Sequence, residues 1–239
     1  MNSVFSNVRI VLVGTTHPGN IGAAARAMKT MAQDNLYLVN PKEFPSAEAT
    51  ARATGADDIL ANAKIFPDLK SAISDCELVI TTSARVRSIP WPMVSPYKCA
   101  QKIADLGEGN TAIVFGRENS GLSNDEMELC NMVLQIPTNT DYCSLNLGSA
   151  VQVICYELLL KASENIVSNE ISNDSLVNQE KMEMLYTHLE QCMIDIGFHD
   201  ATNPRKLMHR LRRLFNRAQL AESEWKILRG FLTKVQEKL

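Results

Sequence analysis

The sequence is poor in long apolar runs, in leader-like patterns and in clustered cysteines. Its longest apolar runs are short, as at residues 10–13 (I-V-L-V), and none approaches the roughly 18 residues that a membrane span requires. Residues 1–9 lack a basic lead, an apolar stretch and a small-residue cleavage site, so no signal peptide is predicted. The six cysteines form no C-x-x-C pair and do not cluster with the four histidines, which argues against a zinc site and against a disulfide framework. We therefore expect free thiols, no metal and a cytoplasmic protein.

Net charge is also small. With 24 basic and 27 acidic residues the chain carries a formal charge of −3, which argues against a general nucleic-acid coat. Its 239 residues suffice for one large domain, or for one domain with a small appendage, and 45% hydrophobic residues exclude wholesale disorder. Positive charge is concentrated in one stretch, because no acid lies between positions 204 and 219. This basic stretch indicates a focused contact with a polyanion, and it contains Arg205, Lys206, Arg210, Arg212, Arg213 and Arg217.

Short apolar segments alternate with helical patterns over the first two thirds of the chain. Helical spacing of apolar residues begins at about Asn20 and recurs over residues 144–162. A capping box at Ser123 and Glu126 opens another helix. Strands rich in β-branched residues are predicted at 8–13, 36–39, 78–82, 111–115 and 132–136. This alternation predicts an α/β fold with a mainly parallel sheet and helices on both of its faces.

The last third of the chain has a different character. Residues 164–178 are polar and rich in serine and asparagine, which is typical of a linker. Only helical patterns follow, at 179–196, 205–217 and 222–235. We therefore predict three parts: an α/β domain over 1–163, a linker over 164–178 and a small helical extension over 179–239.

Open parallel sheets bind ligands at the carboxyl ends of their strands. Four predicted loops lie there, at 14–20, 83–87, 116–121 and 137–146. The first has glycines at 14, 19 and 22, a spacing that fits neither G-x-G-x-x-G nor a P-loop, so a nicotinamide-dependent oxidoreductase is disfavoured. Asn20 suits a helix N-cap. Arg26, inside an apolar stretch, is either solvent-facing or a positioned cation.

Two further loops carry polar residues that turn chemistry does not require. Glu118 and Asn119 directly follow a strand between glycines, and a polar turn does not explain them. Ser144 is a natural N-cap for the helix that follows, but capping does not explain Asn146 two positions on. Glu118 and Asn146 are therefore candidate site residues.

Three segments, taken together, form a pattern that is specific for one family. They are N-I-G-A-A-A-R at 20–26, F-G-R-E-N-S-G-L at 115–122 and I-P-T-N-T-D-Y-C-S-L-N-L-G-S-A-V at 136–151. In this order and spacing they resemble the three motifs of the SpoU-like RNA 2′-O-ribose methyltransferases of the SPOUT superfamily. Further segments at 8–31, 82–93 and 206–218 are similar to the bacterial tRNA (cytidine/uridine-2′-O)-methyltransferases within that family. The resemblance covers nearly the whole chain.

The resemblance implies a SPOUT fold, in which the C-terminal part of the α/β domain threads through a loop to form a trefoil knot. True knots are essentially absent from other folds. The resemblance also implies S-adenosyl-L-methionine as the cofactor. The cofactor is expected to bind at the knot in a bent shape, held mostly by backbone groups and with its adenine among apolar side chains. Carried over by motif, the cofactor-binding residues are Thr82, Ser83, Ala84, Gly116, Ile136, Cys143, Ser144 and Leu145.

The implied reaction transfers a methyl group from a sulfonium to a ribose 2′-hydroxyl. The resemblance gives Arg26 the central role, as a base or as a polarising group. Because an arginine has a pKa above about 12 and keeps its proton in proteins, we expect Arg26 to hold the phosphate or to stabilise the alkoxide. Asn20, Glu118, Ser144 and Asn146 are expected to orient Arg26 and the ribose. The family forms homodimers with composite sites, so Arg26 is expected to act beside the knot of the partner subunit.

The basic stretch lies where these tRNA enzymes carry a helical extension that grips tRNA and supports the dimer. Leu207, Leu211 and Leu214 are predicted to form its buried face, and a merely solvated amphipathic helix is the alternative. Trp91 offers either base stacking or a packed anchor for its loop. The predicted RNA-binding residues are Arg85, Arg87, Arg205, Lys206, Arg210, Arg213 and Arg217.

The leading hypothesis is methylation of cytidine or uridine at the first nucleotide of the tRNA anticodon loop, position 32. One alternative is a SpoU-like enzyme that acts on ribosomal RNA. Another is a non-catalytic RNA-binding protein on the same scaffold, which would need a damaged cofactor motif, and the sequence contains none. The expected partners are tRNA and a second copy of the chain, with no membrane and no structural metal.

Overall fold

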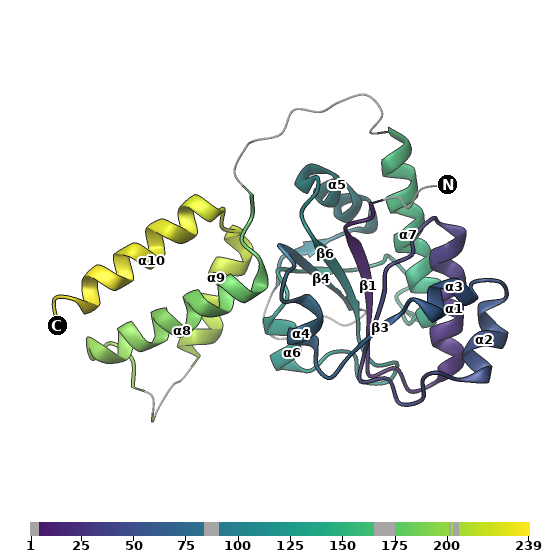
Figure 1. Cartoon of the computed structure of the whole chain (residues 1–239), viewed down its shortest axis with the longest axis horizontal. Helices are drawn as coiled ribbons and strands as arrows, with labels where there is room; N and C mark the ends of the chain where they lie inside the picture. Colours follow the sequence, from purple (N-terminus) through teal and green to yellow (C-terminus); the bar gives the residue numbers. More distant parts are fainter. Residues whose placement is uncertain (1–4, 84–90, 165–174, 201, 203–205) are drawn as a thin grey trace.

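The computed structural model describes residues 5–83, 91–164, 175–200, 202 and 206–239. Within them, an α/β domain of three layers is followed by a group of helices that ends at the C-terminus (Figure 1). No helix in the described part of the chain is both long enough and apolar enough to cross a membrane.

A parallel sheet of seven strands forms the middle layer of the domain, counted over the described residues. The strands are β1 (Val8–Val13), β2 (Leu36–Val39), β3 (Lys64–Phe66), β4 (Leu78–Thr82), β5 (Met93–Val94), β6 (Thr111–Phe115) and β7 (Met132–Leu134). Their order across the sheet is β3-β2-β1-β6-β4-β7-β5, and every neighbouring pair is parallel. The predicted parallel sheet is thus confirmed. β3 and β5 were not predicted, and β7 ends at Leu134 instead of at residue 136.

β7 lies between β4 and β5, although these two strands are consecutive along the chain. Thr81 of β4 and Met93 of β5 both pair with Val133 of β7. The chain that leaves β6 must enter the sheet between two strands that precede it in the sequence.

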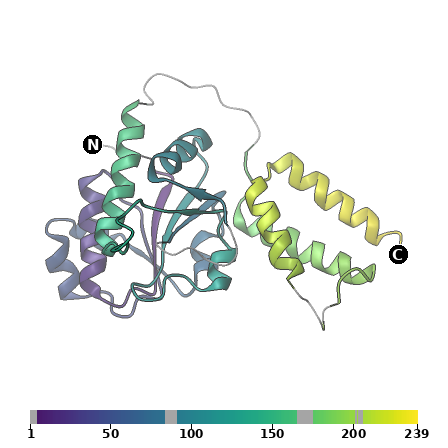
Figure 2. The ribbon, with the colours of Figure 1, turned by 180° about the vertical axis from the view of Figure 1, so that it is seen from behind.

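Helices cover both faces of the sheet, as predicted (Figures 1 and 2). One face carries α1 (Pro18–Thr30), α2 (Ala47–Ala53), α3 (Asp57–Ala61), α5 (Pro96–Leu106) and α7 (Leu147–Glu164), and the other carries α4 (Leu69–Ile73) and α6 (Asn124–Glu128). Alternate strand residues serve the two cores: Ile10 and Leu12 pack with the first set of helices, Val11 and Val13 with the second. Because both faces are buried, β1 is apolar at nearly every position.

Two helices begin at other residues than the sequence predicts. α1 starts at Pro18, with His17 and not Asn20 in the N-cap position. Proline suits the first helical position, since that position needs no amide donor. α7 starts at Leu147 and not at Ser144. Both differences matter for the site, because they free Asn20 and Ser144 from capping.

The C-terminal helices α8 (Gln179–Asp195), α9 (Leu207–Ala218) and α10 (Glu222–Gln236) share a small apolar core. That core is distinct from the two cores of the sheet and is formed by Val177, Met182, Leu185, Tyr186, Cys192, Leu220 and Leu232. The group lies beside the sheet face that carries α4 and α6 (Figure 2). Gln179 fixes this contact, because its amide donates to the Cys76 carbonyl and its side chain donates to the Leu129 carbonyl, both at 2.7 Å.

The predicted buried face of α9 is wrong. Leu207 and Leu211 are half-buried, and Leu214 is 44% exposed. Met208 and Phe215 pack against the apolar core of the C-terminal helices instead. The helix is therefore rotated, relative to the prediction, so that a partly polar face turns inward.

Asn216 explains this rotation. It is the most deeply buried residue of α9, with 1% of its surface exposed. Its Oδ1 accepts a 2.6 Å hydrogen bond from the Tyr186 hydroxyl, and its Nδ2 donates to the carbonyls of Glu128 and Cys130 at 3.0 and 3.2 Å. A buried polar group needs such partners. All three partners lie outside α9, so the periodicity of α9 alone does not reveal them.

Candidate active site

Residues of the three motifs meet where β1 and β6 end and α7 begins. The Asn20 Nδ2 donates to Glu118 Oε1 at 2.9 Å, and the Asn146 Nδ2 donates to Asn20 Oδ1 at 3.2 Å. The partners are 98 and 126 residues apart in the sequence. We call Asn20, Glu118 and Asn146 the motif cluster. It joins three of the five residues that the sequence predicts as catalytic.

Glu118 is held as a carboxylate at the amino end of α1. Besides the Asn20 amide, it accepts hydrogen bonds from the Thr16 backbone amide at 3.2 Å and from the Thr16 hydroxyl at 3.0 Å. Burial raises the pKa of Glu118, but the hydrogen bonds from Asn20 and Thr16 outweigh burial and leave this pKa below its ordinary value. The positive end of the helix dipole also favours the charge. Glu118 is therefore ionised at neutral pH.

Thr16 is a residue of this site that the sequence did not single out. It lies in the loop after β1, and its partner Glu118 is 102 residues further along the chain. A hydroxyl just before a helix is a common turn residue, so its local surroundings carry no signal for this contact. Only the parallel pairing of β1 with β6 brings the two loops together.

Both asparagines of the motif cluster use both ends of the side-chain amide. Asn20 donates to a carboxylate, which only accepts, so its Oδ1 is the atom that faces Asn146. The Asn146 Oδ1 accepts from the Gly148 amide, and the Asn146 carbonyl accepts from the Ala150 amide, both at 2.9 Å. Asn146 is therefore the N-cap of α7, and the prediction that Ser144 caps this helix is wrong. One side chain both starts α7 and joins it to α1.

Close backbone packing fixes the loop after β6. A Cβ on Gly116 would lie 2.3 Å from the Gly121 carbonyl carbon, so glycine is required there. Arg117 and Gly121 exchange backbone hydrogen bonds, and the Arg117 guanidinium binds Glu126 through two nitrogens at 2.8 and 2.9 Å. Glu126 also completes the predicted capping box with Ser123, which is confirmed. The loop thus presents the carboxylate of the motif cluster from a fixed backbone.

Arg26 forms no hydrogen bond with the motif cluster. Its side chain is exposed in the third turn of α1, and no ion pair joins it to a carboxylate within the described residues. The structure therefore does not bring Arg26 into the group that is expected to orient it. A guanidinium without an internal partner keeps its charge and its donors available to a ligand.

The residues predicted to hold the cofactor fall into two groups. In the first, the Thr82 hydroxyl donates to the Val114 carbonyl at 3.3 Å, and the Ser83 amide donates to the Leu134 carbonyl at 3.2 Å. Ile136 follows β7 and is partly buried against the main core. Because β4 and β7 are neighbours in the sheet, Thr82, Ser83 and Ile136 gather at the same edge.

The second group, Cys143, Ser144 and Leu145, lies on the loop between β7 and α7. Leu145 is 39% exposed, and residues 139–146 are all open to solvent. The Thr138 hydroxyl donates to the Cys143 carbonyl at 3.2 Å, which folds the loop back on itself. Small side chains and an accessible backbone suit a ligand that is held mainly by main-chain groups.

The basic face of α9 is smaller than the sequence indicates. The Arg212 guanidinium binds Glu183 through two nitrogens at 2.5 and 3.0 Å and lies 4.4 Å from the centre of the Tyr186 ring, so its charge is already matched. Trp91 packs, partly buried, against the core under α4 and α6, which makes it an anchor. Four predicted RNA-binding residues are wholly or partly exposed, namely Lys206, Arg210, Arg213 and Arg217. Other predicted residues lie outside the described part of the chain, namely Ala84, Arg85, Arg87 and Arg205.

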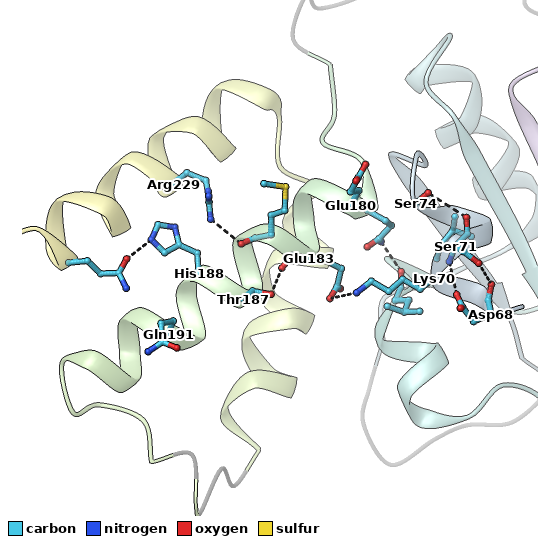
Figure 3. A pocket seen from close by; sticks show the side chains of 15 residues that line it. Asp68, Lys70, Ser71, Ser74, Glu180, Glu183, Thr187, His188, Gln191 and Arg229 are labelled. Carbon is cyan, nitrogen blue, oxygen red and sulfur yellow. Dashed lines mark hydrogen bonds and ion pairs between the residues drawn. The ribbon is translucent and has the colours of Figure 1, made fainter.

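A cavity of about 1000 Å³ lies elsewhere, between α4, α8 and α10 (Figure 3). Three of its charged side chains already meet partners: Lys70 is 3.9 Å from Glu183, and Arg229 donates to the Met184 carbonyl at 3.0 Å. No motif residue lines this cavity, so it is not the candidate active site. The described residues contain no group of three or more His, Cys, Asp or Glu side chains that suits a metal ion.

The fold and the motif cluster define the class of protein. Residues 7–156 match the model of the SpoU rRNA methylase family, and the chain therefore belongs to this family of methyltransferases. Residues 180–239 match the model of the C-terminal domain of the tRNA methyltransferase TrmJ. The resemblance found in the sequence is confirmed.

Relatives extend the comparison along the whole chain. The chain is 45% identical to the tRNA (cytidine/uridine/adenosine-2′-O-)-methyltransferase TrmJ of Pseudomonas aeruginosa, over 98% of this chain and 95% of that protein. Among solved structures, TrmJ from Z. mobilis matches with a TM-score of 0.82 and 32% identity, over 95% of this chain and 98% of that one. The SpoU methyltransferase AviRb from Streptomyces viridochromogenes, in complex with the cofactor AdoMet, shares the fold at 20% identity and a TM-score of 0.51, over 65% of this chain and 60% of that one.

Proposed function

We propose that this protein is an S-adenosyl-L-methionine-dependent enzyme that methylates the ribose 2′-hydroxyl of cytidine or uridine at the first nucleotide of the tRNA anticodon loop, position 32. The observation that carries the proposal is the motif cluster, in which Asn20, Glu118 and Asn146 link the three motifs by hydrogen bonds. The similarity to proteins named TrmJ over nearly the full length supports tRNA as the substrate.

The loops after β4, β6 and β7 fit the cofactor. Ile136 is partly buried and Leu145 is 39% exposed, so together they offer apolar surface to an adenine ring. The other predicted cofactor-binding residues have small side chains, which suits a ligand held mainly by main-chain groups, and they are Thr82, Ser83, Ala84, Gly116, Cys143 and Ser144. When bound, S-adenosyl-L-methionine supplies a methyl group on a positively charged sulfur.

The chain's own groups supply alignment and charge. Alignment of reactants contributes up to roughly 7–11 kcal/mol, and the motif cluster provides a rigid base for it. We assign Arg26 to the phosphate beside the target ribose or to the alkoxide that forms at O2′, because its proton is retained. Ser144, two residues before Asn146, is assigned to the ribose. Glu118 is assigned a positioning role, since its lowered pKa makes it a weak proton acceptor.

A homodimer with composite sites and a trefoil knot complete the proposal. The exposed Arg26, which has no bond to the motif cluster of its own chain, supports a role beside the site of the partner subunit. The position of β7 between β4 and β5 supports passage of the following chain through the loop after β4.

We also propose that residues 179–239 bind tRNA and support the dimer, joined by 164–178 to a methyltransferase domain over 1–163. The separate core of the C-terminal helices supports this division. Exposed cations on α9 suit contacts with RNA phosphates. The proposed RNA-binding set is Lys206, Arg210, Arg213 and Arg217, extended by Arg85, Arg87 and Arg205. The substrate favours a cytoplasmic location.

The test is to incubate the protein separately with unmodified tRNA transcripts and with ribosomal RNA, each with radiolabelled S-adenosyl-L-methionine, and to map the label to a nucleotide. Binding of the cofactor is measured in parallel by calorimetry. Label on the ribose at position 32 supports the proposal. Label on another tRNA nucleotide overturns the position, and label only on ribosomal RNA overturns the substrate. Absence of both label and cofactor binding would overturn the catalytic role and favour a non-catalytic RNA-binding protein.

A further inference from the structure

A tight turn precedes the start of α7 and presents an aromatic ring. The Tyr142 amide donates to the Asn139 carbonyl at 3.2 Å, and the Asp141 amide donates to Asn139 Oδ1 at 3.0 Å. The bond from Thr138 to the Cys143 carbonyl closes the turn. The Tyr142 side chain is 81% exposed, the highest value among the large apolar side chains of the described residues. An ordered backbone thus holds a ring out into solvent, where it costs hydrophobic free energy.

The ring lies close to the motif cluster. Tyr142 is two residues before Ser144 and four before Asn146, and four extended residues reach at most about 14 Å. Asn146 in turn is hydrogen-bonded to Asn20. A group bound by Tyr142 is therefore within one nucleotide or two of any ribose held at the motif cluster.

The chemistry of the turn selects a neutral, flat ligand. Residues 137–146 contain no lysine or arginine, and Asp141 stands directly beside Tyr142. A phosphate is therefore repelled by this turn, whereas the face of a nucleobase is not. Unpaired RNA bases stack on exposed aromatic side chains, and an anticodon loop offers such bases.

We infer that the Tyr142 ring stacks on the base of the nucleotide whose ribose is methylated. The inference rests on the proposed function and deepens it by naming the contact that holds the target base. Every base has a π-face, so stacking tolerates different bases. The ring therefore fixes where the base lies while leaving cytidine and uridine both acceptable, and selection between bases must come from elsewhere.

The experiment combines two protein variants with two substrates. Tyr142→Phe keeps the ring, and Tyr142→Leu removes it. Each is assayed on tRNA with uridine at the target nucleotide and on tRNA with dihydrouridine there, whose ring is puckered and stacks poorly. We expect Tyr142→Phe to stay within about twofold of wild type and Tyr142→Leu to lose about 5- to 100-fold in kcat/KM on uridine. Dihydrouridine should slow the wild type, and it should slow Tyr142→Leu much less.

Three results would overturn the inference. An equal dihydrouridine penalty in wild type and Tyr142→Leu would mean that the ring does not contact the base. A loss of S-adenosyl-L-methionine affinity in Tyr142→Leu, measured calorimetrically, would assign the ring to the cofactor. A change of oligomeric state on light scattering would assign it to a second copy. Mapping of the product with the wild type decides the proposed function separately, and the dihydrouridine is placed at whichever nucleotide carries the methyl group.

Discussion

Asn20 and Glu118 are 98 residues apart in the chain, and a hydrogen bond of 2.9 Å joins their side chains. The bond runs from the first turn of α1 to the loop after β6, and through Asn146 it continues to the start of α7. The three motif segments are therefore connected mechanically. A change in one of them is expected to disturb the other two.

Asn20→Ala is expected to lower the rate of methylation more than the stability. The change takes one donor from Glu118 and the acceptor from Asn146. Loss of a hydrogen bond to a charged group costs about 1.5–3 kcal/mol, or roughly 10- to 150-fold in kcat/KM if the motif cluster positions the reactants. Steady-state kinetics measure the loss. Asn119→Ala, at an exposed neighbour of Glu118, is the control and should behave as wild type, whereas unchanged kinetics for Asn20→Ala would refute a positioning role.

Arg26→Ala is expected to abolish methyl transfer and to leave the affinity for S-adenosyl-L-methionine nearly intact. Removal of one charge-stabilising donor typically costs about 10²- to 10³-fold in kcat. Single-turnover assays and calorimetric titration with the cofactor separate the two effects. Arg52→Ala, at an exposed arginine on the neighbouring α2, serves as the control. A large loss of cofactor affinity in Arg26→Ala would assign Arg26 to the cofactor.

Because of Glu118, the free energy of unfolding is expected to depend on pH in the acid range. Burial raises its pKa, but hydrogen bonds from Asn20 and Thr16 lower it below the ordinary value of about 4.3. The unfolded chain therefore binds this proton more tightly than the folded protein does. The contribution of Glu118 is complete above its unfolded pKa and is lost as pH falls through its folded pKa. The free energies of unfolding of wild type and Glu118→Gln, measured in urea, should differ by a constant amount near neutral pH and converge in acid. A difference that grows as the pH falls would contradict this prediction.

Asn216→Ala is expected to destabilise the protein by about 2–3 kcal/mol. The change leaves the buried Tyr186 hydroxyl and the carbonyls of Glu128 and Cys130 without this partner. Equilibrium urea unfolding measures the loss, and limited proteolysis shows whether the C-terminal helices detach first. Asn62→Ala, at an exposed asparagine after α3, is the control. Equal stability of both variants would mean that water replaces these bonds.

Two variants of α9, one with two arginine substitutions and one with a single substitution, are expected to separate tRNA binding from folding. Arg210→Ala with Arg217→Ala removes exposed cations, so tRNA affinity should fall and the salt dependence of log K should flatten by about one per phosphate contact. Arg212→Ala removes the partner of the Glu183 carboxylate and should reduce stability instead. Filter binding at several salt concentrations and thermal melting distinguish them. Unchanged tRNA binding in the double variant would leave α9 as a solvated helix.

Most strands of the sheet could be predicted because their own residues carry a recognisable pattern. β1, β2, β4 and β6 are apolar on both faces, and that pattern needs no tertiary information. β3 lies at the sheet edge with Lys64 and Ile65 exposed, and β5 has two residues, so neither carries a readable pattern. The order of the strands, in which β7 lies between β4 and β5, is not indicated by any local sequence pattern.

The site was predictable by motif but not by geometry. Capping rules assign Ser144 to the start of α7 and leave Asn146 unexplained, whereas the fold does the reverse. Local rules fail there because Asn146 has a second partner on α1. The same cause hid Thr16, whose partner comes from β6, and misplaced the inner face of α9, whose Asn216 bonds to another helix and to the segment before β7.

The strand order also sets constraints on synthesis. β5 pairs with β7 alone among the described strands, so a nascent chain that has reached α6 holds β5 without a neighbour. The sheet is completed at an interior position, because β7 is synthesised after both of its neighbours and must insert between β4 and β5. That same strand leads directly into the motif loop at 136–146. A chain arrested before this step would keep most of its secondary structure but would lack the assembled candidate active site. The completion of folding and the onset of activity should therefore coincide in time.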